Sequence, residues 1–302
     1  MSRHVVVAAA LLLALAGAGP RQQPVFRTHV DVVRLDVLAT DRGRPIRGLT
    51  AADFEVLDNG TPRRVEVVSA DRVPLDVALV LDVSQSVRGD VLAHLKRAAL
   101  ALNDALDAKD RVALWTFSHR VSRLVAPTGD RERVRGAIDA MAPGGATALL
   151  DAIYTALASR APGPNRPVAL VFSDGRDNRS WLAESDVIDA ARASETVIYA
   201  VTFTPKPAPA SLAAPTVDVG PDEVLLAALA DGCGGRLLRT ASERELGLRF
   251  LEVLDETRTR YVLTYAVGAN SAPGWHTLTV RLTRRTGQVK ARAGYQLAPG
   301  GG

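Results

Sequence analysis

Three oxygen-bearing side chains follow one short apolar run at alternate positions. Asp82, Ser84 and Ser86 come directly after the apolar residues 77–81. A short apolar run bounded by polar residues is typical of a buried parallel strand. The carboxyl end of such a strand is where open α/β sheets place their ligand sites. Carboxylate and hydroxyl oxygens are the donors that hard divalent cations prefer, so this spacing predicts a small divalent-cation site at the end of the strand.

Two further segments carry oxygen donors in comparable positions. Thr147 stands in the glycine-rich segment 144–149, just before a helical pattern. Asp174 follows a second apolar run at 168–173 and precedes a glycine. Because right-handed crossovers bring the carboxyl ends of parallel strands to one edge of a sheet, Asp82 and Asp174 are expected on the same face. A divalent cation between them would offset the cost of burying two carboxylates.

Together the three segments resemble the von Willebrand factor A (VWA) domain. Its metal-ion-dependent adhesion site (MIDAS) consists of D-x-S-x-S, a distant Thr and a distant Asp before Gly. All five positions are filled here, which implies a metal site made by Asp82, Ser84, Ser86, Thr147 and Asp174. The resemblance implies that the hydroxyls contact Mg²⁺ (or Mn²⁺ or Ca²⁺) directly or nearly so, with the aspartates acting partly through water. It also implies an open coordination position that accepts an acidic residue of a protein ligand.

Helix capping is the simpler explanation for some of these residues. Ser and Asp are favoured N-caps, so Ser86 could cap a helix beginning near Val87, and Thr147 could cap the helix that follows it. Capping accounts for single hydroxyls but not for the D-x-S-x-S spacing together with Asp174. The metal interpretation is therefore favoured, and Asp177 and Asn178, just past the second strand, are expected to support the loop.

An enzyme is the alternative class of function. An aspartate at a strand end before a helix also suggests a metal-dependent hydrolase or phosphotransferase that uses Asp82 as nucleophile. Such enzymes need a second acid two residues later, where this chain has Ser84, and the sequence contains no G-x-S-x-G elbow. The histidines have no partners at metal-ligand spacing, and Cys233 has no obvious base partner. The sequence therefore predicts a non-enzymatic binding module.

Alternating strands and helices are predicted between residues 76 and 260. Apolar runs predict strands at 77–81, 112–118, 168–173, 196–203 and 237–240. Helical periodicity predicts helices at about 87–106, 131–141, 148–160, 185–195, 222–230 and 243–257. This order predicts an α/β fold with a doubly wound, mainly parallel sheet and flanking helices, as the VWA resemblance also implies.

Both flanks of that region show the two-residue period of β-strands. Apolar and polar residues alternate at 33–37 and 65–68 before it, and at 261–265 and 278–282 after it. Neither flank has enough strands to bury a sheet face alone. We therefore expect these four strands to share a sheet in a small all-β sandwich into which the α/β domain is inserted, with two independent β modules as the alternative. The segment 48–60 also resembles the N-terminal module of bacterial VWFA-related secreted proteins.

The first residues have the pattern of a secretory signal peptide. Arg3 and His4 precede an apolar stretch at 5–16, and residues 16–18 form a small-x-small cleavage site. The stretch is too short for an ordinary membrane span, and an uncleaved N-terminal anchor is the alternative. The expected organisation is a signal peptide at 1–18, a β segment at 26–75, a VWA domain at 76–260 and a β segment at 261–297. The expected location is outside the cell or in the periplasm.

Composition says little about partners. The 302 residues include 37 Lys and Arg and 33 Asp and Glu, a formal net charge of +4. The arginine pairs at 63–64 and 284–285 form no stripe with interleaved aromatics, so nucleic acid is not an expected partner. Cys233 is the only cysteine, so no intramolecular disulfide is expected.

The Pro/Ala-rich segment 205–220 follows a strand end on the predicted metal face. It is either a loop that determines specificity or a flexible insert. The sequence names neither the protein ligand nor the oligomeric state.

Overall fold

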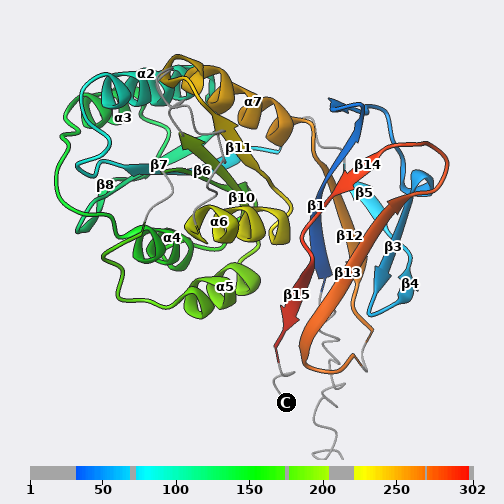
Figure 1. Cartoon of the computed structure of the whole chain (residues 1–302). Helices are drawn as coiled ribbons and strands as arrows, with labels where there is room; N and C mark the ends of the chain where they lie inside the picture. The colour runs from blue at the N-terminus through cyan, green and yellow to red at the C-terminus, as the bar shows by residue number, and fades with distance from the viewer. Residues whose placement is uncertain (1–31, 69–72, 174–176, 204–220, 269–270, 299–302) are drawn as a thin grey trace, which may run out of the picture. The chain divides into compact units, whose positions relative to one another are not determined.

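The computed structural model describes residues 32–68, 73–173, 177–203, 221–268 and 271–298 (Figure 1). Three features predicted from the sequence lie outside these residues: the signal peptide at 1–18, Asp174 and the segment 205–220. None of the helices in the described part of the chain has the combination of length and hydrophobicity that a membrane span requires.

A six-stranded sheet forms the centre of the α/β part, in the order β11-β10-β9-β6-β7-β8 (Figure 1). Its strands are β6 (Leu75–Asp82), β7 (Arg111–Phe117), β8 (Val121–Thr128), β9 (Arg166–Ser173), β10 (Val197–Phe203) and β11 (Leu237–Thr240). All neighbouring strands are parallel except β7 and β8. The predicted doubly wound, mainly parallel sheet is therefore confirmed.

Strand β8 is the one element of this sheet that the sequence did not predict. It lies at the edge of the sheet, and Val125 is its only buried residue. An edge strand that faces solvent lacks the apolar run by which central strands are recognised. By contrast, every residue of the central strand β9 is buried.

Helices cover both faces of the sheet. On one face lie α2 (Asp90–Ala105), α3 (Arg131–Asp139) and α7 (Leu246–Arg258), and on the other lie α4 (Leu149–Ala158), α5 (Glu184–Ala193) and α6 (Pro221–Gly232). Two short 3-10 helices, η1 (Ala51–Asp53) and η3 (Glu243–Glu245), complete the helical elements of the described residues. The helices bury one side each, as amphipathic surface helices do.

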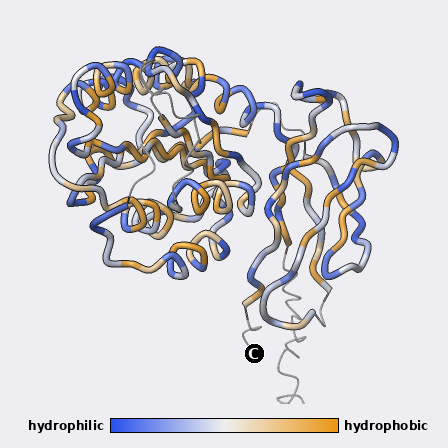
Figure 2. Tube along the Cα trace, in the orientation of Figure 1, coloured by the Kyte–Doolittle hydropathy of each residue, from blue (hydrophilic) through white to orange (hydrophobic). Residues whose placement is uncertain are grey.

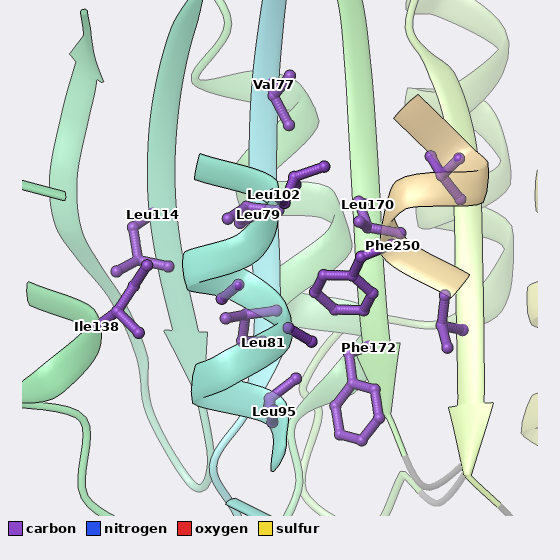
Figure 3. Packing of buried hydrophobic residues seen from close by; sticks show 14 of the residues in the cluster. Val77, Leu79, Leu81, Leu95, Leu102, Leu114, Ile138, Leu170, Phe172 and Phe250 are labelled. Atoms are coloured by element: carbon purple, nitrogen blue, oxygen red, sulfur yellow. The ribbon is translucent and has the colours of Figure 1, made fainter. Parts of the chain in front are cut away.

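The hydrophobic core follows this layering. Figure 3 shows Leu95 of α2 and Phe250 of α7 against Leu81 of β6 and Phe172 of β9, and all four side chains are buried. Figure 2 shows the hydrophobic residues gathered along the central strands. The apolar core thus holds β6 and β9 rigidly side by side, with their carboxyl ends at the same edge.

Two antiparallel sheets are built from both flanks of the chain. The first has the order β14-β1-β12-β5, with β2 beside β1, and the second has the order β15-β13-β3-β4. Their strands are β1 (Val32–Asp41), β2 (Arg44–Pro45), β3 (Phe54–Asp58), β4 (Thr61–Arg63), β5 (Glu66–Val68), β12 (Tyr261–Ala266), β13 (Gly274–Leu282), β14 (Gln288–Lys290) and β15 (Gly294–Leu297). Buried residues of both sheets form one cluster, for example Leu35 and Leu263 with Val56 and Leu278. The predicted β sandwich of N- and C-terminal segments is confirmed.

The predicted pairing inside the sandwich is wrong in one respect. Residues 278–282 do not share a sheet with β1 but pair with β3, from Leu278 opposite Asp58 to Leu282 opposite Phe54. Strand β3 alternates buried and half-buried residues over five positions and so offers a full-length partner. Residues 54–58 belong to the segment 48–60 that resembles the VWFA-related module, and no strand was predicted there.

A buried arginine joins the sandwich to the α/β sheet. Arg166, the first residue of β9, is fully buried. Its Nε donates to Asp36 Oδ1 of β1 at 2.5 Å, and its Nη1 and Nη2 donate to the carbonyls of Thr257 at 2.5 Å and Arg260 at 3.0 Å. Burial lowers the pKa of Arg166, which the Asp36 carboxylate opposes. Hydrogen bonds to all three guanidinium nitrogens are what makes such a buried cation tolerable.

Candidate metal centre

The carboxylate of Asp82 is held at the edge where β6 and β9 end. Asp82 is the last residue of β6 and is fully buried. The backbone N–H of Ser84 donates to Asp82 Oδ1 at 2.8 Å. Ser173 Oγ, from the last residue of β9, donates to Asp82 Oδ2 at 3.1 Å. Ser173 is not among the predicted site residues, although a hydroxyl at the end of an otherwise apolar strand is a sequence signal for it.

The two serines after Asp82 bring their hydroxyls together. Ser84 Oγ and Ser86 Oγ are 2.9 Å apart, with Ser84 buried and Ser86 exposed. The following helix, α2, begins only at Asp90, and its N-cap is Gly89 with a φ of 61°. The alternative that Ser86 caps this helix is therefore wrong. Its hydroxyl faces Ser84 and not a helix terminus.

Thr147 lies in a loop whose backbone is hydrogen-bonded to Asn178, in another loop. Its N–H donates to Asn178 Oδ1 at 2.9 Å, and its carbonyl accepts from the Asn178 N–H at 3.0 Å. Thr147 is buried, but the N-cap of α4 is Ala148, which makes no side-chain capping bond. The alternative that Thr147 caps α4 is wrong too. Neither the Ser86 nor the Thr147 side chain is therefore the N-cap of the helix that follows it.

The first turn of α4 is capped by the loop after β9. Asp177 Oδ2 accepts from the N–H of Leu150 at 2.9 Å, and Ser180 Oγ accepts from the N–H of Asp151 at 3.2 Å. Burial raises the pKa of Asp177, but hydrogen bonds from Ser180 and Leu150 outweigh it, so the pKa lies below its usual value. Asp177 and Asn178 support the loop, as the sequence suggested.

Two backbone contacts hold the glycine-rich loop against the Asp82 loop. The N–H of Gln85 donates to the carbonyl of Gly145 at 2.9 Å, and the N–H of Gly144 donates to the carbonyl of Val83 at 2.8 Å. Gly145 has a φ of +82°, and a Cβ there would lie 2.0 Å from His119 Nδ1. Only glycine allows this left-handed backbone and the close approach of the histidine ring.

These donors have the chemistry that a hard divalent cation requires. One carboxylate and three hydroxyls stand on two adjoining loops at the carboxyl edge of the sheet, and Asp174 directly follows the described Ser173. All are oxygen donors, which is the preference of Mg²⁺ and Ca²⁺. Within the described ranges no group of three or more His, Cys, Asp or Glu side chains is placed to hold a metal. The residues present fit a MIDAS-type set.

The segment that carries Asp82, Ser84, Ser86 and Thr147 matches a known protein family. Residues 77–176 match the family model of the von Willebrand factor type A domain, and the matched segment runs from β6 past the end of β9. The chain contains a von Willebrand factor type A domain. The predicted family resemblance is therefore confirmed for the segment that carries the candidate site.

Two curated relatives of the chain are bacterial proteins. A UPF0353 protein of Mycobacterium sp. (strain KMS) is 31% identical over 192 residues, which cover 55% of this chain and 56% of that protein. An uncharacterized protein of Synechocystis sp. is 32% identical over 114 residues, which cover 35% of this chain and 26% of that protein. The chain thus spans about half of the first relative's length and about a quarter of the second's.

Solved structures agree on the fold. Proximal thread matrix protein 1 from the mussel byssus, in a form with a zinc-occupied MIDAS motif, superposes with a TM-score of 0.53. The identity is 18%, and the match covers 68% of this chain and 50% of that one. At this level of identity the similarity concerns the VWA fold alone.

Proposed function

We propose that this protein is a secreted or periplasmic binding module that recognises a protein ligand through a MIDAS-type metal site. One Mg²⁺, or Mn²⁺ or Ca²⁺ in its place, would be held by Asp82, Ser84, Ser86, Thr147 and Asp174. The observation that carries the proposal is the placement of the hydroxyls of Ser84 and Ser86 next to a buried carboxylate, outside any helix cap. The VWA fold and the metal-occupied MIDAS of the mussel protein support it.

The chain's own residues would orient the metal donors. Ser173 and the Ser84 N–H together hold both oxygens of Asp82, and Asn178 holds the backbone on both sides of Thr147. When bound, the cation would supply an open position for a carboxylate of the partner. Residues that hydrogen-bond to metal ligands, as Ser173 and Asn178 would do here, fix the orientation of the ligating side chains.

An exposed aromatic side chain near the loop that supports Thr147 favours a protein as the ligand. Trp181 is 96% exposed, and its backbone N–H donates to both Asp151 carboxylate oxygens at 3.1 Å. It lies three residues after Asn178, which is bonded to Thr147. Tryptophan is enriched among the residues that dominate protein interfaces. Because the backbone at Trp181 is already held by Asp151, less conformational entropy would be lost on binding than for an unbonded loop.

The geometry is less consistent with the enzymatic alternative. A hydrolase or phosphotransferase would need Asp82 to attack a substrate. Asp82 is fully buried, and its two carboxylate oxygens accept hydrogen bonds from Ser84 and Ser173. Ser84 also occupies the place of the second acid. These observations favour a role for Asp82 in holding a cation over a role as nucleophile.

Metal-dependent capture of a ligand tests the proposed function. The full chain is immobilised and exposed to proteins of the source organism's cell envelope and medium, in Mg²⁺ and in EDTA. We expect a defined protein to be retained in Mg²⁺ and released by EDTA, and Ser86→Ala to retain none. Ser122→Ala, an exposed serine on β8, is the matched control and should behave as the unchanged chain. If the same amount of protein is retained in EDTA as in Mg²⁺, binding does not depend on a metal and the proposal is contradicted.

A further inference from the structure

A cavity of about 110 Å³ lies at the end of the sheet opposite to the candidate metal centre. Its lining includes Val77 near the start of β6, Arg111 at the start of β7 and Val168 near the start of β9. The metal donors, by contrast, stand where β6 and β9 end. The cavity is therefore separate from the site that the proposed function uses.

Three alanines in register form the floor of the cavity. Ala78 of β6 lies opposite Ala113 of β7 on one side and opposite Ala169 of β9 on the other. The last turn of α4, with Leu157, covers this floor, and Trp115 of β7 forms a wall. Protein interiors are normally close-packed, so a row of three small side chains under a helix is what leaves this space.

Positive charge surrounds the cavity. Arg111 is paired with Asp76, with Nη2 to Oδ2 at 2.5 Å, and Asp76 also accepts from Asn165. The guanidinium of Arg123 lies over the Trp115 ring, 5.4 Å from its centroid. Arg160 also lines the cavity, so three arginines face one acidic residue there.

Arg160 supplies the decisive observation. Its Nε is buried and has no hydrogen-bond partner among the residues that the structure describes. A buried donor without a partner is costly, and the guanidinium fork matches a carboxylate by two parallel hydrogen bonds. The residue stands two positions after the end of α4, at the side of an apolar cavity. A ligand with one anionic group and a compact apolar body would match the positive charge of this guanidinium and the apolar cavity beside it.

We propose that this cavity binds a small carboxylic acid with an aromatic or branched aliphatic body. The apolar body would rest on the alanine floor against Trp115, and the carboxylate would accept hydrogen bonds from Arg160. An apolar cavity of about 150 Å³ holds benzene in an engineered protein. The present cavity is somewhat smaller, so the carboxylate would sit at its mouth, on the side of Arg160.

Binding of model acids to the full chain tests this proposal. Benzoate and cyclohexanecarboxylate are titrated by calorimetry and saturation-transfer NMR, with benzyl alcohol as the neutral match and phenyl phosphate as the alternative anion. EDTA is present throughout, so that no carboxylate can bind through a metal at the other site. We expect saturable 1:1 binding of both acids, with benzyl alcohol and phenyl phosphate at least tenfold weaker. A preference for phenyl phosphate would reassign the site to phosphate esters and overturn the proposal.

Variants separate charge from shape. Arg160→Gln should weaken benzoate binding at least tenfold and leave benzyl alcohol unchanged, whereas Arg97→Gln, an exposed arginine on α2 across the sheet, should change neither. Ala113→Leu should abolish binding of every probe by filling the cavity. If Ala113→Leu does not fold, Ala78→Val serves for the same test. The proposal would be overturned if neither acid binds to the unchanged chain. It would also be overturned if Arg160→Gln binds benzoate with the same affinity as the unchanged chain.

Discussion

Single hydrogen bonds position the oxygen donors of the candidate metal centre. The two Asp82 oxygens accept from Ser84 and Ser173, and the Thr147 backbone is bonded to Asn178 on both sides. Such contacts orient donors before a cation arrives, which reduces the cost of ordering them on binding. Substitution of a donor residue therefore removes an oxygen ligand. Substitution of a residue that hydrogen-bonds to a donor leaves the ligand in place but less well oriented.

Asp82→Asn removes the charge and keeps the shape of the side chain. We expect metal affinity to fall by about 100-fold or more, because an amide is a much weaker ligand for a hard cation than a carboxylate. Mg²⁺ at 100 times the Kd of the unchanged chain should stabilise that chain by about 2.7 kcal/mol and the variant by about 0.4 kcal/mol or less. Calorimetry and thermal melts with Mg²⁺ and with EDTA measure both effects. Normal metal affinity in Asp82→Asn would show that this carboxylate has only a structural role.

Asn178→Ala tests positioning without removing a donor. The variant loses the side-chain hydrogen bond to the Thr147 N–H. Loss of a residue that orients a metal ligand typically weakens binding by about 10- to 100-fold. We expect Mn²⁺ affinity to fall within this range, with Asn178→Asp recovering part of it because the acceptor oxygen returns. If Asn178→Ala binds Mn²⁺ as tightly as the unchanged chain, Thr147 needs no such support.

The residues of the site differ in how far the sequence could reveal them. Asp82, Ser84 and Ser86 could be predicted because their spacing is local to one strand end. The contact between Asn178 and Thr147 could not, because it joins positions 31 residues apart. Ser173 was missed for a related reason. Its hydroxyl gains a role only because the fold places it beside the Asp82 carboxylate.

At the level of elements, helix α4 depends on a distant loop for its cap. Its N-cap residue, Ala148, makes no side-chain bond, and Asp177 and Ser180 supply the acceptors instead. The helical period predicted the start of this helix to within one residue, but local sequence could not show which residues cap it. Strand β8 escaped prediction because only one of its residues is buried, whereas the buried strands β6 and β9 were placed to within two residues.

Asp177→Ala should destabilise the protein through this cap. Loss of a capping side chain costs about 0.5–2 kcal/mol. Because Asp177 also accepts from the N–H groups of Arg179 and Ser180, we expect a value near the upper end. Chemical denaturation in EDTA measures the effect apart from metal binding. Asp189→Ala, an exposed aspartate on α5, is the control and should stay within about 0.5 kcal/mol of the unchanged chain. Equal stability of the two variants would contradict the capping role.

At the scale of the whole molecule, a buried ion pair links the two chain segments of the sandwich. His276 Nδ1 lies 2.7 Å from Asp58 Oδ1, and His276 Nε2 lies 2.8 Å from the carbonyl of Ala272. Both ring nitrogens face acceptors, which suits the doubly protonated imidazolium. Burial lowers the pKa of His276, but the bonds to Ala272 and Asp58 outweigh it and leave the pKa raised. Asp58 also accepts from the hydroxyls of Tyr265 and Tyr295.

This ion pair predicts a pH dependence of stability. A histidine whose pKa is higher in the folded state contributes its full stabilisation below the unfolded pKa of about 6.5. The contribution disappears as pH rises through the folded pKa. We therefore expect the melting temperature in EDTA to fall above pH 6.5, and His276→Gln to flatten this dependence. His94→Gln, on the surface of α2, should keep it. The same slope in His276→Gln as in the unchanged chain would assign the effect to another group.

Anomalous diffraction from a crystal soaked in Mn²⁺ tests the metal site most directly. We expect one strong manganese peak at the carboxyl edge of β6 and β9. Ser84 Oγ and Ser86 Oγ should lie in its coordination sphere at about 2.1–2.2 Å, near the range for small divalent ions on oxygen. Asp82 and Asp174 should lie beside it, directly or through water. The absence of a peak at this edge, or a peak elsewhere with these hydroxyls bonded only to protein, would contradict the assignment.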